Sequence, residues 1–256
     1  MLVTPIKTRK FLPPKDNLFS LIKESFKKIK LAEKSVFVFA SKIVAISQGR
    51  CLKIGSIEKD RLIKKEADYY LERDKVPKKR IILTIKNNIL ISSAGIDESN
   101  ARGYYILWPE KPYQATRKIY RFIKKQYKLK NFGVIITDSR TTPKRWGTMG
   151  IAIAYYGFYP LKDYRGQKDI FGRKLKITQA NLVDGLAVSA LFTMGEGIEQ
   201  TPMAIIKDIK NIKFKEFDPT KKNLVEIEEK IDVYYPLLNA IKWKKGGTQN
   251  KFANSL

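Results

Sequence analysis

The sequence predicts a mixed α/β fold, because helical and strand-like segments alternate irregularly along its 256 residues. Residues 36–40 and 132–137 are short, almost wholly apolar runs, which are typical of buried strands. Residues 113–127 instead carry apolar side chains at helical spacing between lysines and arginines. Because strict alternation is missing, we expect an α/β fold of the mixed α+β kind.

The remaining elements follow from the same patterns. Asp16 is placed to cap a helix, and the apolar face of that helix is formed by Leu18, Leu21, Ile22, Phe26 and Ile29. Residues 56–73 form a further amphipathic segment, and the apolar runs 81–85 and 89–92 flank Lys86-Asn87-Asn88 as in a β-hairpin. Strands are expected at 151–156 and 203–206, and a helix is expected at 178–194.

The domain organisation is expected to be simple. The chain has no internal repeat, no low-complexity segment and no linker rich in proline, glycine or serine. We expect one catalytic unit over residues 1–243 and a flexible polar tail over residues 244–256, which begins beside Gly246-Gly247. No apolar stretch approaches the roughly 20 residues that cross a bilayer, and no signal peptide precedes Pro13. We therefore expect a cytoplasmic protein without a membrane partner.

The side-chain inventory excludes several kinds of chemistry. The sequence has no histidine and a single cysteine, Cys51, so His-dependent triads, His-ligated zinc and disulfides are ruled out. Any metal would have to bind oxygen ligands, which favours Mg²⁺ or Mn²⁺. The 51 Lys+Arg against 25 Asp+Glu give a formal charge of +26, which favours anionic partners. A non-catalytic nucleic-acid or anion-binding protein is the alternative, although the lysines are dispersed and no nucleic-acid module is present.

Polar clusters follow three apolar segments, where α/β proteins usually build sites. Residues 92–101 contain Asp97 and Asn100, residues 133–139 end in Asp138 and Ser139, and residues 194–202 contain Glu196 between glycines. Each cluster also has a local explanation, because Asp, Ser and Asn favour turns and glycine often ends a helix. The residues alone leave both explanations open.

Together these segments resemble the coenzyme F420:gamma-glutamyl ligase family. The resemblance spans residues 5–208 and rests on Ser41-Lys-Ile-Val44, Ala94-Gly-Ile-Asp-Glu-Ser-Asn100, Ile136-Thr-Asp-Ser139, the block 163–172 and Met194-Gly-Glu196. It implies GTP as substrate nucleotide, Mg²⁺ or Mn²⁺ with K⁺ as a further ion, and an α/β fold with mixed sheets in an intertwined homodimer. It implies L-glutamate and a small anionic carboxylate as substrates.

The resemblance also implies a set of site residues. The metal ligands would be Asp97, Asp138, Ser139 and Glu196. The nucleotide contacts would be Leu12, Pro13, Pro14, Lys15, Ser41, Asn100, Met194, Gly195, Glu196, Gly197 and Thr201. Asp138 and Arg145 are the catalytic candidates, with Asp163 and Arg165 as further site residues.

The sequence departs from the family pattern in two places. Ile46 stands where the family has a second lysine, and Arg140-Thr141-Thr142 replaces the usual Thr-Phe-Gly-Arg order. Both departures lie beside expected nucleotide and metal positions, so recognition should differ before chemistry does. The expected acceptor is therefore a polyanionic carboxylate, either coenzyme F420-0 or a related or folate-like molecule, activated as an acyl phosphate.

Overall fold

The computed structural model describes residues 1–220 and 223–247. Its strands are β1 (Leu2–Ile6), β2 (Val36–Ala40), β3 (Cys51–Lys53), β4 (Tyr69–Leu71), β5 (Leu83–Lys86), β6 (Ile89–Ser92), β7 (Tyr104–Ile106), β8 (Gly133–Arg140), β9 (Met149–Tyr156), β10 (Leu161–Asp163), β11 (Gln179–Asn181), β12 (Met203–Lys207) and β13 (Lys244–Lys245). Its α-helices are α1 (Leu18–Phe26), α2 (Ser41–Ser47), α3 (Lys59–Glu66), α4 (Pro112–Tyr127), α5 (Leu182–Met194) and α6 (Tyr235–Asn239). Short 3₁₀ turns are η1 (Arg73–Lys75), η2 (Pro77–Lys79), η3 (Ser93–Gly95) and η4 (Glu229–Ile231). The predicted mixed α/β fold is confirmed.

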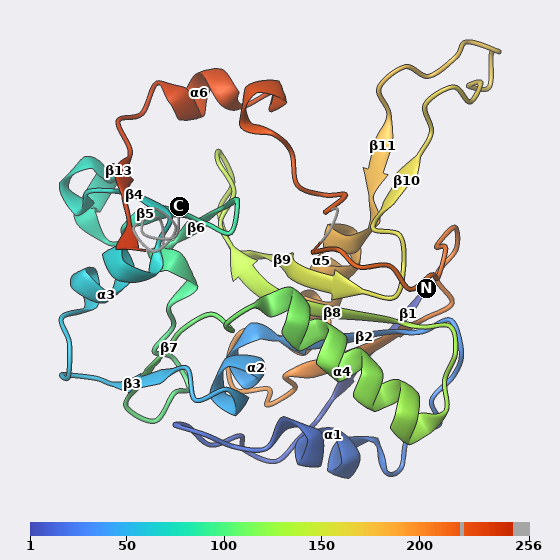
Figure 1. Ribbon diagram of the computed structural model, residues 1–256, viewed down its shortest axis with the longest axis horizontal. Coiled ribbons are helices and arrows are strands. Elements are labelled where there is room, and N and C mark those ends of the chain that lie inside the picture. The colour runs from blue at the N-terminus through green and yellow to red at the C-terminus, as the bar shows by residue number, and fades with distance from the viewer. Residues whose placement is uncertain (221–222, 248–256) are drawn as a thin grey trace.

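The centre of the molecule is a sheet with the strand order β1-β12-β2-β8-β9 (Figure 1). Only the β2–β8 pair is parallel, and the other neighbours in this sheet are antiparallel. Alternate residues of β2 enter opposite cores: Phe37 and Phe39 pack with α1 and α4, whereas Val36 and Val38 pack with α5. The continuous apolar run of β2 is therefore explained by helices on both faces.

A smaller sheet, β13-β4-β5-β6, stands beside the central one together with the β3–β7 pair. The predicted hairpin is confirmed as β5 and β6, with Asn87 and Asn88 at φ +50° and +59°. Positive φ at both turn residues suits the right-handed twist of a two-residue hairpin, and asparagine tolerates it. Leu62 and Ile63 of α3 pack under this sheet in a separate apolar cluster.

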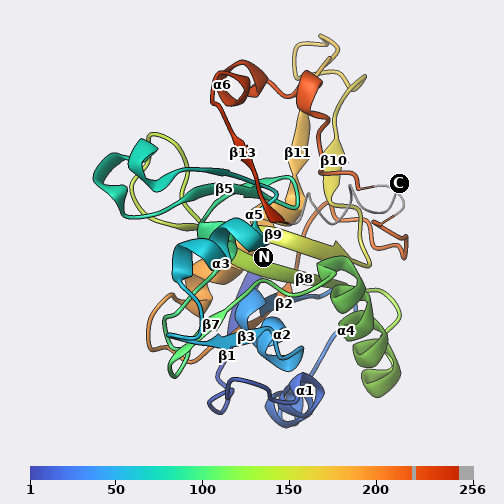
Figure 2. The ribbon, with the colours of Figure 1, turned by 60° about the vertical axis from the view of Figure 1, so that its left-hand side comes forward.

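Two arms leave the body of the protein. The β10–β11 hairpin extends away from the central sheet in both views, and α6 lies far from that sheet (Figures 1 and 2). After α6 the chain returns, and β13 pairs with β4. Lys244 and Lys245, the first residues of the expected flexible tail, thus lie in a sheet, while residues 248–256 lie outside the described residues.

Several expected element boundaries are wrong, each for a physical reason. Asn17, not Asp16, caps α1, because the Asp16 carboxylate is bound by Arg9. Residues 56–73 split into α3 and β4, since the chain turns extended at Ala67 and Tyr69–Leu71 pairs with β5. The expected helix 178–194 begins only at Leu182, because residues 179–181 pair with β10.

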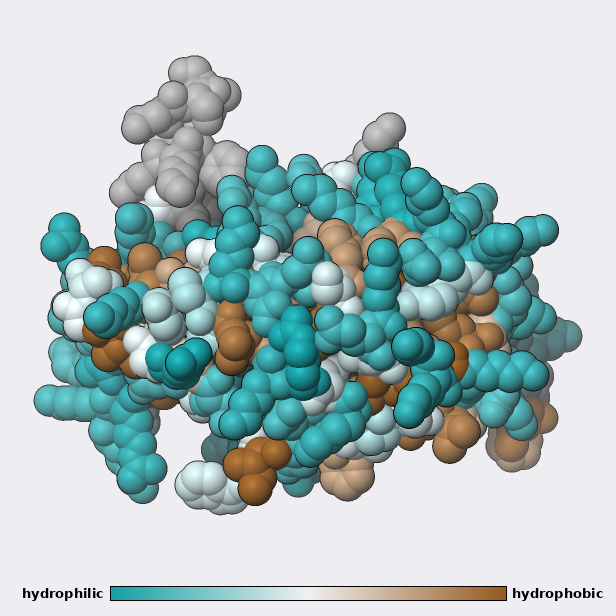
Figure 3. Space-filling model, turned by 90° about the horizontal axis from the view of Figure 1, so that it is seen from below, coloured by the Kyte–Doolittle hydropathy of each residue, from teal (hydrophilic) through white to brown (hydrophobic). Residues whose placement is uncertain are grey.

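The strand that was expected over residues 132–137 continues to Arg140, where it pairs with Met149 of β9. Strand β1 was not expected at all. Among the described residues, no helix combines the length and apolar character required to cross a membrane. The face that bears α1 and α4 is covered mainly by hydrophilic side chains with small separate apolar patches (Figure 3).

Candidate functional site

The three polar clusters meet at one end of the central sheet. In the parallel β2–β8 pair Ala40 lies opposite Thr137, so Ser41 and Asp138 leave the paired region side by side. The Ala40 N–H donates to the Pro202 carbonyl over 2.9 Å, which brings the loop before β12 to the same end. Strand order alone therefore gathers residues that are far apart in the sequence.

Asp97 is held by a lysine that the sequence analysis did not select. Lys42 Nζ lies 2.6 Å from Asp97 Oδ2, and Ser99 donates from its backbone N–H to Oδ1 and from its hydroxyl to Oδ2 over 2.7 and 3.0 Å. Burial alone would raise the pKa of Asp97, but the Lys42 ammonium and the Ser99 hydrogen bonds outweigh it and lower that pKa. Asp97 is thus a carboxylate at neutral pH, paired with a cation.

Asp138 lies deeper in the same site. Its Oδ2 accepts a hydrogen bond from the Trp108 indole, and its Oδ1 accepts one from the Ser139 N–H over 2.9 Å. Burial raises the pKa of Asp138 to about 6, the two hydrogen bonds oppose this rise, and the negative charge of Asp97 adds to it. Two neighbouring carboxylates, one of them buried, attract a cation, and Lys42 supplies part of that positive charge.

The loop after α5 closes the site from the other side. Asn100 Nδ2 donates to the Gly197 carbonyl over 2.9 Å, which joins the first cluster to the third. Thr148 Oγ1 donates to Glu196 Oε1 over 3.1 Å and so ties this loop to the segment after β8. Gly195 has φ +79°, and a Cβ there would overlap the Glu199 carboxylate, which accepts from the Gly197 N–H. Glycine is required at this turn.

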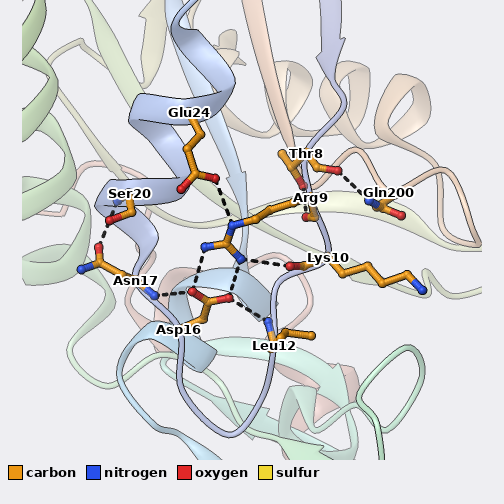
Figure 4. Close-up of polar contacts among 9 residues, drawn as sticks. All are labelled: Thr8, Arg9, Lys10, Leu12, Asp16, Asn17, Ser20, Glu24 and Gln200. Carbon is orange, nitrogen blue, oxygen red and sulfur yellow. Dashed lines mark hydrogen bonds and ion pairs between the residues drawn. The ribbon is translucent and has the colours of Figure 1, made fainter.

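The turn from Leu12 to Lys15 is shaped by an ion pair beneath it (Figure 4). Arg9 donates to both oxygens of Asp16 over 2.6 and 2.9 Å, and Asp16 accepts from the Leu12 N–H over 3.0 Å. The Arg9 guanidinium therefore lowers the pKa of Asp16 to about 2. The turn contains a cis peptide bond between Pro13 and Pro14.

The same N-terminal segment is bonded to the loop after α5. The Thr8 N–H donates to the Gln200 carbonyl over 3.2 Å, and the Gln200 side-chain amide donates back to the Thr8 carbonyl over 2.6 Å. Lys7 Nζ also donates to the Glu199 carbonyl over 2.8 Å. The Leu12–Lys15 turn thus starts from a segment fixed to the loop of Met194, Gly195, Glu196, Gly197 and Thr201. Thr201 closes that loop by donating to the Met194 carbonyl.

Other candidates are not brought into this cluster. Arg145 is exposed in the loop between β8 and β9, where its backbone N–H donates to the Thr142 carbonyl over 3.4 Å. Asp163 and Arg165 pair with each other over 2.6 Å on the exposed β10–β11 arm. Ile46 is buried against Ala101, and partly buried Phe11 packs on the same cluster. Ile46 therefore supports the start of the Leu12–Lys15 turn by apolar packing, and it places no charge there.

The acidic residues fit a metal only in part. In residues 1–220 and 223–247 no three acidic or cysteine side chains are close enough to share one metal ion. Asp97 and Asp138 fit a hard divalent cation, because both offer carboxylate oxygens and the negative charge of one raises the pKa of the other. Glu196 is engaged by Thr148 instead, so it would have to move to join them.

Sequence reasoning missed Lys42, Trp108 and Thr148. Lys42 could have been selected from the sequence, because it lies in the motif that begins at Ser41, directly after a buried strand. Trp108 and Thr148 become visible only in the folded chain, where Trp108 contacts Asp138 of β8 and Thr148 contacts Glu196 in the loop after α5.

Comparisons with known proteins bear on this arrangement. The family model described as F420-0:Gamma-glutamyl ligase matches residues 6–208, which include all three clusters. The chain belongs to this family. The resemblance stated from the motifs is therefore confirmed.

Relatives of known name agree with the family. The chain is 33% identical over 226 residues to the coenzyme F420:L-glutamate ligase of Methanopyrus kandleri, covering 81% of this chain and 87% of that protein. The ligase of the same name from Methanosarcina mazei is 31% identical over 213 residues, or 76% and 80% of the two chains. That of Methanocaldococcus jannaschii is 42% identical over 134 residues, or 52% and 53%. The family is one of ligases.

Proposed function

We propose that this family member is a GTP-dependent gamma-glutamyl ligase that requires Mg²⁺ or Mn²⁺. It forms an amide bond between the amine of L-glutamate and the carboxylate of an anionic acceptor, either coenzyme F420-0 or a related or folate-like molecule. Family membership over residues 6–208 supports the ligase class. The observation that carries the proposal is the neighbouring pair of carboxylates, Asp138 on β8 and Asp97, which Lys42, just after the end of β2, holds.

The proposed metal ligands are Asp97, Asp138, Ser139 and Glu196, with K⁺ as a further ion. A bound divalent cation would neutralise phosphate charge and polarise a phosphoryl oxygen. Lys42 is placed to compensate the charge of Asp97 before the ion enters. Asp138, fixed by two hydrogen bonds, presents its oxygens in one orientation.

The proposed nucleotide contacts lie on the two loops that Thr8 and Gln200 join, together with Ser41 and Asn100. Asn100 is fixed by its bond to Gly197, so this amide and the backbone of that loop face the same region. The N–H groups of a glycine-rich turn suit phosphate oxygens. Arg145, exposed on the β8–β9 loop, is the proposed partner of an acceptor anion.

The reaction would proceed in two steps. The acceptor carboxylate takes the γ-phosphoryl group of GTP, which forms an acyl phosphate and releases GDP. The glutamate amine then attacks the carbonyl carbon, a C–N bond forms, the C–O bond to phosphate breaks, and the amine loses a proton. Positioning and charge neutralisation suffice for such a transfer, so the absence of histidine is no obstacle.

We also propose a homodimer in the cytoplasm. Large apolar side chains stand exposed on both arms: Ile170, Phe171 and Ile177 on the β10–β11 arm, and Ile231, Val233 and Leu237 around α6. Exposed apolar groups gathered on projecting elements favour burial against another chain. Sedimentation of the purified protein tests this assembly.

The function is tested by glutamate-dependent phosphate release with GTP and Mn²⁺, using F420-0 and folate-type acceptors in parallel. Asp138→Asn should lower turnover by about 100-fold or more, because a neutral amide replaces a metal-binding carboxylate. Asp74→Asn, which changes an exposed carboxylate far from the site, should not. An active Asp138→Asn enzyme contradicts its role. If neither GTP nor the less favoured nucleotide ATP binds in the presence of Mg²⁺ or Mn²⁺, the ligase function is contradicted. Salt-sensitive nucleic-acid binding without turnover favours the alternative.

A further inference from the structure

Trp108 connects the two candidate carboxylates although it belongs to none of the family motifs considered above. It is fully buried, and its indole N–H donates to Asp138 Oδ2. Two residues earlier, the backbone of Ile106 exchanges hydrogen bonds of 3.0 and 2.8 Å with the backbone of Asp97. The segment from Ile106 to Trp108 is therefore bonded to both acidic residues.

Gly95 lets the chain around Asp97 pack directly on the indole. A Cβ at position 95 would overlap the Trp108 ring at the edge that bears the N–H. Gly95 also has φ +71°, a conformation that glycine adopts without strain. The backbone two residues before Asp97 thus rests on the ring edge that holds Asp138.

A partly buried ion cluster contacts the ring face and the backbone of Trp108. Lys86 Nζ lies 5.9 Å from the Trp108 ring centroid and 2.8 Å from Glu66 Oε2. Arg50 Nη2 lies 2.6 Å from the same Glu66 oxygen, and Arg50 Nε donates to the Trp108 carbonyl over 3.3 Å. The cation over the ring face, the bond to the backbone of Trp108 and the full burial of the ring all oppose rotation of the indole.

We infer that Trp108 is a positioning residue, which turns the Asp138 carboxylate toward Asp97 so that both can bind one divalent cation. The inference rests on the proposed function, in which these two carboxylates hold the metal. The indole occupies Oδ2 and the Ser139 N–H occupies Oδ1, so rotation of the carboxylate costs two hydrogen bonds. Hydrogen bonds to a metal-binding side chain typically change metal affinity about 10- to 100-fold.

The contact itself is tested without nucleotide or metal. In protein labelled with ¹⁵N at tryptophan, the three indole N–H signals are assigned with single Trp→Phe variants. Asp138→Asn weakens the acceptor of the Trp108 N–H, so that signal should move upfield. The Trp243 signal should stay, because its N–H donates to the Leu238 carbonyl. An unmoved Trp108 signal would overturn the inference.

The positioning role is tested by Mn²⁺ titration, in which free Mn²⁺ is measured by electron paramagnetic resonance. Trp108→Phe keeps an aromatic ring and removes the N–H, and should weaken Mn²⁺ binding about 10- to 100-fold. In turnover assays the Mn²⁺ concentration for half-maximal rate should rise by the same factor, with the KM for glutamate unchanged. Trp243→Phe loses an equivalent indole bond and should leave both quantities unchanged.

The outcomes separate the two proposals. If the wild-type protein binds Mn²⁺ and Trp108→Phe binds it equally well, the inference fails and the proposed function stands. If the wild-type protein neither binds Mn²⁺ nor releases phosphate, the proposed function fails. Should Trp108→Phe not fold, Gly95→Ala takes its place in the titration, because it displaces the ring without removing it, and equal Mn²⁺ binding then refutes the role.

Discussion

Glu66 stabilises the fold through a nearly buried cation, Lys86, and a partly exposed one, Arg50. Its carboxylate lies 2.8 Å from Lys86 and 2.6 Å from Arg50, and only 7% of the Lys86 side chain is exposed. Burial alone would raise the pKa of Glu66, but these two cations outweigh it and lower the pKa. Glu66→Gln would leave Lys86 buried beside a second positive charge. Removing one partner of a buried pair costs about 3–5 kcal/mol.

We expect Glu66→Gln to lie near the lower limit, about 3 kcal/mol, because glutamine still offers Lys86 a hydrogen-bond acceptor. Glu72→Gln is the matched control. Glu72 also bridges two lysines, Lys64 and Lys244, but these are 35% and 59% exposed. Such surface pairs contribute about 1 kcal/mol or less.

Urea unfolding followed by circular dichroism at neutral pH measures both losses. Adding Lys86→Met to Glu66→Gln should restore most of the lost stability. The substitution removes the buried cation that has lost its partner, and methionine keeps the volume of the lysine side chain. The reasoning is refuted if Glu66→Gln costs no more than Glu72→Gln, or if the double variant is less stable than Glu66→Gln alone.

Other expectations follow from single contacts. Asp16→Asn should lower stability by about 1 kcal/mol after solvent screening of the surface pair. The pKa of Asp16 is lowered in the folded protein, so its pairing with Arg9 stabilises the fold above about pH 4 and is lost as the pH falls towards 2. Melting temperatures measured across this pH range should show that loss in the wild-type protein and not in Asp16→Asn. Gly150→Ala would place a Cβ 2.5 Å from the Ala187 carbonyl oxygen, and thermal denaturation should show a loss of about 1–3 kcal/mol. Asn100→Ala should weaken GTP binding about tenfold in calorimetry, and unchanged affinity would contradict the nucleotide role of this amide.

The strongly patterned parts of the fold were predictable from the sequence. Strand β2 and the Asn87-Asn88 turn can each be recognised from neighbouring residues in the sequence. Strand β1 does not, because most of its side chains are exposed and Pro5 interrupts it, so only its pairing with β12 makes it a strand. The start of α1 was misplaced for a similar reason, since a contact with Arg9 occupies Asp16.

The candidate site was also predictable only in part. Asp97, Asp138 and Glu196 could be selected because acidic residues follow apolar segments. The pairing of Lys42 with Asp97 and of Trp108 with Asp138 joins residues 55 and 30 positions apart. Local patterns hold no information on such contacts. It could not be predicted either that Glu196 accepts a hydrogen bond from Thr148 and does not join the other two carboxylates.

The position of β12 has a consequence for how the protein is made. β12 lies between β1 and β2, so these two early strands cannot pair with each other and must wait for residues 203–207. During synthesis, the edge of β2 that β12 will cover stays open while roughly four-fifths of the chain emerges, and open apolar edges invite pairing with other chains. The loop that closes the site enters with that same late strand. A nascent chain therefore completes the candidate site and covers this open strand edge at the same stage of synthesis.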